Sequence, residues 1–250
     1  MNISVITLFP AVVQPFFTTS IMKRAQEAGK ASIKTVDLRD FALDSYGTVD
    51  DRPYGGGAGM VLRIEPLHAA LNQVDPNHQA HRVMTSPRGV VWNQAKAVEF
   101  SHKKDLVIIA GHYEGFDDRI TQHIDEEVSI GDYVMTGGEL AAAVVVDSVV
   151  RLLPGVLKKE DAAAIESFMP VSLDELEKAV GSTPELQNLR NTGGKTMVSL
   201  LEYPHFTRPQ TYEGHAVPEV LLSGNPKELR VWQLRESYRI TKERRPDLLS

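Results

Sequence analysis

The sequence predicts an α/β fold built on a parallel sheet, followed by a small, mainly helical C-terminal domain. The first 150 residues alternate short runs rich in β-branched residues with helical patterns, as in a parallel sheet covered by helices. Three glycine-rich loops in this region each follow or close an expected strand. After Lys158 the chain becomes polar, and it ends in a long, charged helical pattern. We therefore expect an α/β domain at residues 1–157, an interdomain linker at 158–200 and a C-terminal domain at 201–250.

The composition is that of a folded protein without cysteine chemistry. Of the 250 residues, 42% are hydrophobic and 24% are charged, the net charge is -6, and there is no cysteine. A chain of this length can bury a substantial core. The lack of Cys excludes a disulfide scaffold, a thiolate zinc site, an iron–sulfur cluster and a cysteine nucleophile. Residues 1–17 have no basic segment before their apolar stretch, which Pro10 and Pro15 interrupt, so we expect a cytoplasmic protein without a membrane segment.

The elements of the α/β domain are expected in a regular order. Ile3–Leu8 is rich in β-branched residues and predicts the first strand. Thr19 and Ser20 offer N-cap side chains for a helix that Gly29 ends, and residues 31–38 predict the second strand. The remaining expected elements are strands at 82–85 and 106–110, a helix at 93–102, and a last α/β element from Glu126 into the apolar stretch 140–153.

The linker and the C-terminal domain carry helix signals of their own. In the linker, the piece SLDELEKAV begins with Ser172 and has Glu175 three residues later, which predicts a capping box. The linker is therefore expected to be partly helical or flexible. Asn225 as N-cap and Pro226 at the first helical position predict the start of the final helix. The spacing i, i+4 and i+7 places three basic residues of this helix in one stripe: Arg235, Arg239 and Lys242.

The glycine-rich loops predict a small-molecule site. The first, Val49–Met60, matches neither the P-loop nor the dinucleotide fingerprint, so it is either a phosphate-binding loop, which Arg52 beside it favours, or a mobile surface loop. The other two are Ala110–Arg119 and Ser129–Leu140. Ligands of open α/β sheets bind at the carboxyl ends of the strands. Together with Thr85–Gly89, the loops are therefore expected to surround a ligand at that edge of the sheet.

One arginine stands in an apolar stretch. Arg151 lies in AAAVVVDSVVRLLPG, where a charged group is not fully buried unless it is paired. Asp147, four residues earlier, allows an i, i+4 ion pair, and the alternative is a guanidinium directed into the binding site. The histidines at positions 68, 78 and 81 form no motif typical of a metal site, so we expect none from them.

Five motifs carry a resemblance to a known family, in the order VDDRPYGGGAGM, GHYEGFDDR, SIGDYVMTGGE, DSVVRLLPGVL and YPHFTRP with PEVLLSGNP. In these motifs the chain resembles the bacterial tRNA (guanine-N1)-methyltransferases of the TrmD family, which methylate guanosine 37 next to the anticodon. The match runs from the first strand to RRPDLL and is broken between about Lys158 and Leu200. The resemblance implies a SPOUT-type parallel sheet with a deep trefoil knot that binds S-adenosylmethionine. It also implies a tRNA-binding C-terminal domain and a homodimer with active sites at its interface.

The resemblance implies roles for individual residues. It assigns the catalytic arginine to Arg151 and places Glu166, within IESF, where the family has its catalytic aspartate. Ala141 stands where the family often has proline, and the segment after Phe168 is longer than usual. The residues implied for S-adenosylmethionine are Thr85, Ser86, Pro87, Gly111, Tyr113, Glu114, Gly115, Ile130, Gly131, Asp132, Tyr133, Val134, Met135, Gly137 and Gly138. The residues expected to contact tRNA are Arg52, Gly55, Gly56, Arg208, Arg235, Arg239 and Lys242.

The chemistry of guanine N1 methylation fits the two catalytic candidates. N1 carries a proton and must lose it to become a nucleophile, so a positioned carboxylate is needed as general base. Negative charge then spreads to O6, where a guanidinium can stabilise it. We assign these roles to Glu166 and Arg151, with Glu202 or Asp161 as alternative bases. Two alternative functions remain for the whole chain: a catalytically silent RNA-binding protein on the same scaffold, or a methyltransferase for another RNA. A requirement for Mg²⁺ is implied by the family resemblance only.

Overall fold

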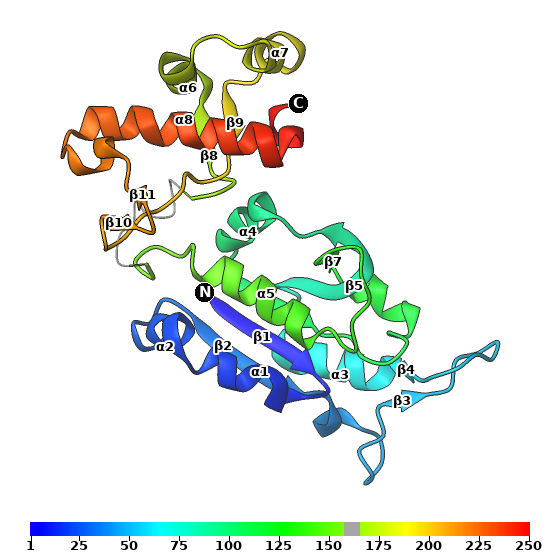
Figure 1. Cartoon of the computed structure of the whole chain (residues 1–250). Helices are drawn as coiled ribbons and strands as arrows, with labels where there is room; N and C mark the ends of the chain where they lie inside the picture. Colours follow the sequence, from blue (N-terminus) through cyan, green and yellow to red (C-terminus); the bar gives the residue numbers. More distant parts are fainter. Residues whose placement is uncertain (158–165) are drawn as a thin grey trace. The chain divides into compact units, whose positions relative to one another are not determined.

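The computed structural model describes residues 1–157 and 166–250 of the chain, which divides into two compact units, Met1–Lys158 and Lys159–Ser250 (Figure 1). Two clusters of buried apolar side chains lie in the first unit and a third lies in the second. In the described part of the chain, no helix is both long and apolar enough to cross a membrane.

A five-stranded parallel sheet forms the centre of the first unit, in the order β2-β1-β6-β5-β7. Its strands are β1 (Asn2–Thr7), β2 (Ser32–Asp37), β5 (His81–Val91), β6 (Asp105–Ile109) and β7 (Glu126–Ser129). The predicted α/β class with a parallel sheet is thereby confirmed. The strand expected at 82–85 is longer than predicted, because β5 resumes its pairing with β7 after a register shift between Thr85 and Val90.

Different helices cover the two faces of this sheet, because successive side chains of a strand point to opposite faces. Ile3 and Val5 of β1 lie in one core with side chains from α1 (Pro10–Phe17), α2 (Ser20–Glu27), α4 (Gln94–Ser101) and α5 (Glu139–Val150). Ile6 of β1 lies in the other core with α3 (Ile64–Val74) and the 3-10 helices Leu38–Phe41 and Asp118–His123. The strands are thus buried on both faces, which leaves their ends and connecting loops to meet a ligand.

The helix signals of the first unit are only partly as predicted. Gly29 has φ +66 just after α2, as expected of a residue that ends a helix. Thr19 precedes α2, but its hydroxyl donates to the Phe16 carbonyl and does not cap the helix. The helices α1 and α3 were not predicted. For α1 the reason is that Pro10 and Pro15 indicate an interruption, whereas Pro10 occupies the first turn, where proline is tolerated.

The second unit is built around the long helix α8 (Pro226–Arg244). Leu234 and Tyr238 of α8 lie in one core with buried leucines of α6 (Leu173–Val180) and α7 (Pro184–Gly193). The Asn225 side chain accepts from the Lys227 N–H at 3.1 Å, which confirms the predicted N-cap of α8. The remaining elements are β8 (Pro170–Ser172) paired with β9 (Met197–Ser199), β10 (Thr211–Tyr212) paired with β11 (His215–Ala216), and the 3-10 helices Glu219–Leu222 and Pro246–Leu249.

The expected linker differs from the structure over its described residues 166–200, which belong to the second unit and contribute to its core. Leu173 and Leu176 are fully buried because their spacing of three places both on the face of α6 that packs against α8. The predicted capping box does not form: Ser172 makes no side-chain cap bond, and the Glu175 carboxylate instead pairs with Arg230 at 2.7 Å. Residues 158–165 of the expected linker lie outside the described residues.

Candidate functional site

A cavity of about 430 Å³ lies where β5, β6 and β7 end at the same edge of the sheet. Its lining comes from three loops, at residues 85–88, 111–118 and 128–138, together with Ala141 of α5. This volume is in the range of small-molecule sites. The lining includes all of the residues implied for S-adenosylmethionine except Asp132, an exposed residue that the cavity does not include. The structure therefore brings the three loops together, while the ligand that they bind stays a prediction.

Glycines allow these loops to interlock. The Gly138 N–H donates to the Gly111 carbonyl at 2.6 Å, and the Gly111 N–H donates to Thr85 Oγ1 at 3.4 Å. A Cβ atom at Gly138 would clash with Thr85 Oγ1 and would lie 2.6 Å from the Gly111 nitrogen. Because that nitrogen belongs to the backbone, any larger residue at this position would force the two loops apart. The close approach of the loops gives the cavity walls that consist largely of backbone.

The first glycine-rich loop joins the rim of the same cavity. It connects β3 (Asp50–Asp51) to β4 (Val61–Leu62), and the backbone on either side of Val61 is hydrogen-bonded to the cavity loop. The Glu114 N–H donates to the Met60 carbonyl at 3.0 Å, and the Leu62 N–H donates to the Gly115 carbonyl at 2.9 Å. Gly55 and Gly56 have φ +86 and +80, which favours glycine, and Arg52 is exposed. The loop is thus exposed at its tip and fixed at its base.

Arg151 lies at the far end of α5 from the cavity. The helix begins after Gly138 in the cavity wall and ends at Arg151, whose N–H donates to the Asp147 carbonyl at 3.2 Å. Twelve residues of α-helix span about 18 Å. Arg151 is accordingly not among the residues that line this cavity. The ion pair with Asp147 that the spacing allows is not among the salt bridges of the described residues.

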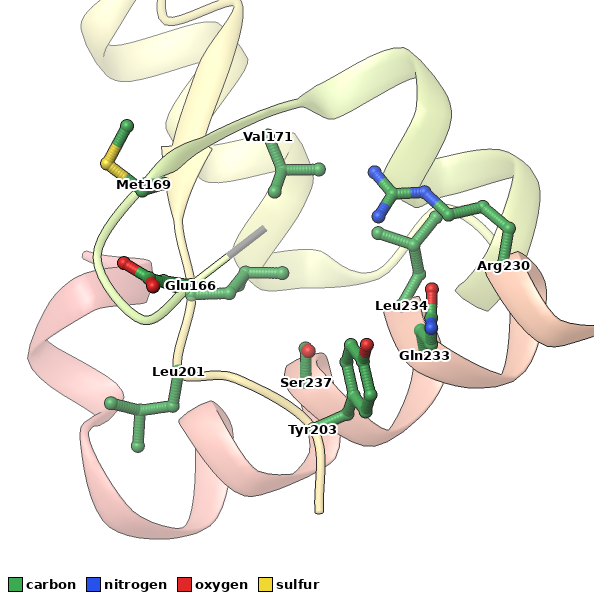
Figure 2. A pocket seen from close by; sticks show the side chains of 10 residues that line it. Glu166, Met169, Val171, Leu201, Tyr203, Arg230, Gln233, Leu234 and Ser237 are labelled. Atoms are coloured by element: carbon green, nitrogen blue, oxygen red, sulfur yellow. The ribbon is translucent and has the colours of Figure 1, made fainter. Parts of the chain in front are cut away.

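Glu166 lies in the second unit, at a small pocket beside α8 (Figure 2). Figure 2 shows its carboxylate on the side of Met169, away from Arg230. Two residues later the backbone of Phe168 has φ +69, its N–H donates to the Leu200 carbonyl at 2.8 Å, and the Arg245 guanidinium lies over its ring, 5.8 Å from the centroid. Glu166 therefore stands next to a backbone held in an unusual conformation. Of the alternative bases, Glu202 pairs with His205 at 2.8 Å, and Asp161 lies outside the described residues.

The basic stripe on α8 is paired with other groups of the same unit. Arg235 donates to the Ala179 carbonyl at 2.7 Å, and Arg239 pairs with Glu236 and Glu243 at 2.8 and 3.3 Å. Lys242 pairs with Glu185 at 2.5 Å, and this hydrogen bond is the main reason why the pKa of Glu185 falls to about 2. Arg208, the other basic residue expected to contact tRNA, is exposed. The stripe thus presents less free positive charge than the sequence suggests.

Two titratable residues at the cavity were not predicted from the sequence. His112 lines the cavity, and Glu139, at the start of α5, has a side chain only 5% exposed, with one oxygen 3.6 Å from the His112 ring. Both stand in the motifs that carry the resemblance, but a glutamate is almost never fully buried unless it is paired, so the burial of Glu139 beside His112 was not expected. Elsewhere, no group of three or more His, Asp or Glu among the described residues could hold a metal ion, so the Mg²⁺ implied by the resemblance has no ligand cluster to support it.

Comparison with known proteins gives a consistent result over the whole chain. The family model described as "tRNA (Guanine-1)-methyltransferase TrmD" matches residues 1–250. A protein of Carboxydothermus hydrogenoformans is 44% identical over 250 residues, covering 100% of this chain and 87% of the relative. Proteins of Desulfitobacterium hafniense and Chloroflexus aggregans are 46% and 45% identical, covering 100% of this chain and 85% and 88% of the relatives. All three relatives bear the name tRNA (guanine-N(1)-)-methyltransferase.

Proposed function

This chain belongs to the tRNA (guanine-1)-methyltransferase family TrmD, and on that premise we propose that it methylates N1 of guanosine 37 in tRNA, next to the anticodon, with S-adenosylmethionine as methyl donor. The chain is a tRNA (guanine-N1)-methyltransferase; the position in the tRNA is our inference. The proposed reaction rests on the family match over all 250 residues, together with a cavity at the expected edge of the sheet. A tRNA substrate is consistent with a cytoplasmic enzyme.

The cavity between the three loops fits S-adenosylmethionine. Its walls combine apolar side chains, among them Pro87, Ile130 and Met135, with the backbone of Gly111 and Gly137. Apolar walls suit the adenine ring, and nearby polar backbone groups can hold the ribose and the amino acid part. When bound, S-adenosylmethionine supplies an electrophilic methyl group on a positively charged sulfur. The protein then has to orient the guanine against that methyl group and to exclude water.

Replacing Gly138 by alanine is expected to weaken cofactor binding without unfolding the protein. The added methyl group would press on Thr85 and on the Gly111 backbone, and forcing an extra methyl into a close-packed site costs roughly 1–3 kcal/mol. Calorimetric titration with S-adenosylhomocysteine, the demethylated product, measures the effect, with affinity for tRNA as the control. Wild-type affinity of Gly138→Ala for S-adenosylhomocysteine would place the cofactor elsewhere.

The two catalytic candidates have complementary tasks. Glu166 takes the N1 proton of guanine as the N1–methyl bond forms and the sulfur–methyl bond breaks, which leaves a neutral thioether. The Arg151 guanidinium stabilises the negative charge that builds up on O6 during this step. Support for Arg151 comes from the motif DSVVRLLPGVL, and support for Glu166 comes from its place where the family has an aspartate, which also carries a carboxylate.

A homodimer explains how Arg151 reaches a methyl donor. Arg151 lies about 18 Å of helix away from the cavity of its own chain, so we propose that it acts in the site of a second copy. Val12 and Phe16 on α1 are 50% and 40% exposed, and Leu140 and Val144 on the adjacent α5 are 58% and 44% exposed. This apolar face begins beside the cavity and is the surface that we propose the second copy covers.

We also propose that the first unit carries the trefoil knot of the SPOUT fold. Support comes from the way in which β5 passes β7 closely after the loop at 86–89. A Cβ atom at Gly89 would lie 2.5 Å from the Glu127 carbonyl carbon and would clash with the Val128 nitrogen. The two backbones are therefore packed against each other next to the cavity.

We expect tRNA binding to depend on salt, with a contribution from the stripe on α8. Each phosphate contact adds about 0.9 to the slope of log affinity against log salt for a duplex. Replacing Arg235, Arg239 and Lys242 together by Gln should flatten that slope and, by leaving Glu185, Glu236 and Glu243 uncompensated, weaken binding. Filter binding between 50 and 200 mM salt tests this, with Arg52→Gln as comparison. An unchanged slope in the triple variant and a changed slope in Arg52→Gln would place the contacts on the first glycine-rich loop.

The proposed reaction is tested by methyl transfer. Purified protein is incubated with unmodified tRNA and S-adenosylmethionine carrying a tritiated methyl group, and the labelled nucleoside is identified after digestion. Label in 1-methylguanosine at position 37 supports the proposal. Label in another nucleoside or another RNA would show a different substrate, and tRNA binding without methyl transfer would indicate a silent RNA-binding protein.

A further inference from the structure

A buried chain of polar side chains lies behind the cavity. Glu139 is 4% exposed, and its Oε1 accepts from the hydroxyl of Thr7, which is 1% exposed, at 3.0 Å. The Thr7 oxygen in turn accepts from the Phe9 N–H at 3.0 Å. The other carboxylate oxygen, Oε2, lies 3.6 Å from His112 Nδ1, a buried atom without a hydrogen-bond partner among the described residues. This series of side-chain contacts therefore links the end of β1, through the first residue of α5, to the cavity loop.

A buried carboxylate in this place needs a positive partner. Removing a carboxylate from water costs several kcal/mol unless it is paired and hydrogen-bonded. In the described part of the chain, His112 is the only basic side chain within ion-pair distance of Glu139. The N-terminus of α5 adds a favourable partial charge, but its effect on an ion is modest. The Glu139 side chain therefore lies between the Thr7 hydroxyl and the His112 ring, and it contacts both.

The position of His112 decides the shape of the cavity loop. His112 forms an isolated bridge with Gly137, and the Phe9 ring packs on its imidazole with 4.7 Å between ring centroids. A Cβ atom at Gly137 would lie 2.5 Å from His112 Nδ1, so this glycine leaves the space in which the imidazole and the carboxylate meet. Next to His112, Tyr113 has φ +58 and lines the cavity. A change in the His112 ring would therefore be transmitted to both glycine-rich loops.

We propose that Thr7, Glu139 and His112 form a positioning network that sets the conformation of residues 111–115 for cofactor binding. This inference rests on the proposed function, since it takes the cavity to be the S-adenosylmethionine site. The residues that the resemblance implies for S-adenosylmethionine include neither His112 nor the two buried residues behind it. In this network Glu139 and Thr7 act through His112, and they hold the loop from the side opposite to the ligand.

The sharpest test compares a single with a double substitution. His112→Gln leaves the buried Glu139 carboxylate without its basic neighbour, whereas His112→Gln combined with Glu139→Gln places two neutral amides there. We expect the single variant to bind S-adenosylhomocysteine at least about tenfold more weakly than wild type, equal to about 1.4 kcal/mol, and the double variant to recover most of this loss. The KM for S-adenosylmethionine should follow the same order, while the KM for tRNA stays constant.

Two further variants keep the test decisive. Thr7→Val has nearly the size of Thr and cuts the network at its far end, so it should weaken S-adenosylhomocysteine binding by about threefold to tenfold with little effect on folding. His68→Gln, a histidine on α3 that stacks on His123, is the matched control and should bind as wild type. Equal affinity of all variants would overturn the network, as would a double variant weaker than His112→Gln. If wild type itself does not bind S-adenosylhomocysteine, the proposed function fails instead.

Discussion

Arg151→Ala is expected to lower the rate of methyl transfer by about 10²- to 10³-fold while cofactor binding stays nearly unchanged. The guanidinium acts on charge that develops on guanine O6 only in the transition state, and removing one such donor typically has an effect of this size. Arg151 also lies outside the cavity of its own chain, so its loss should leave the binding loops intact. Single-turnover rates and titration with S-adenosylhomocysteine separate the two effects.

Two controls distinguish this role from a structural one. Asp147→Ala removes the partner that an i, i+4 ion pair would need, and it should leave the rate of methyl transfer unchanged. Mixing Arg151→Ala chains with Gly138→Ala chains should restore activity, because a hybrid dimer has one site with an intact cavity and an intact arginine. Near wild-type turnover of Arg151→Ala would end its catalytic assignment, and a failure of mixing would show that the arginine acts within its own chain.

Glu166→Gln is expected to reduce methyl transfer by about 10²- to 10⁴-fold, the usual contribution of a general base. Glutamine keeps the size of the side chain but cannot accept the N1 proton. Glu166→Asp should also be impaired, because its carboxylate is one methylene shorter and a misplacement of about 1 Å can cost roughly 10²-fold. The measurement is the rate of methyl transfer as a function of pH at saturating S-adenosylmethionine.

Glu202→Gln is the matched comparison for Glu166→Gln. The Glu202 carboxylate pairs with His205 at 2.8 Å, and the Glu202 N–H donates to the Ser167 hydroxyl oxygen at 2.9 Å, so Glu202 belongs to the same region of the second unit as Glu166. We expect Glu202→Gln to retain methyl transfer. Full activity in Glu166→Gln together with loss in Glu202→Gln would transfer the role of base to Glu202.

The parallel sheet and the cavity loops were predictable from local signals. β-branched runs such as Ile3–Leu8 and Leu106–Ala110 form strands because both of their faces are buried. Glycines such as Gly138 stand where two backbones pack closely together. Such positions are visible in the sequence because they require a residue without a side chain. The edge of the sheet at which the loops meet follows from the parallel strand order.

Other features depend on tertiary contacts that the sequence does not show. Glu175 has the spacing of a capping box, but Arg230, 55 residues later, competes for its carboxylate. Arg239 and Lys242 belong to the basic stripe that the sequence predicts, but in the structure they form ion pairs with Glu236 and Glu185. Glu139 is buried only because Thr7 and His112 come together behind the cavity. For Glu175, Lys242 and Glu139, the partner comes from a distant part of the sequence and is brought close only by the fold.

The order of strands in the sheet also governs how the protein assembles during synthesis. β1 leaves the ribosome first, yet it pairs along one edge with β6, in the register Asn2 with Asp105. At roughly 5 to 20 residues per second, that edge waits on the order of 5 to 20 seconds for its partner. An unpaired apolar edge invites aggregation, and sheets with such distant pairings fold slowly. The nascent chain should therefore need chaperone protection until β7 and the start of α5 have emerged, and a chain truncated before Gly138 would lack a complete cavity.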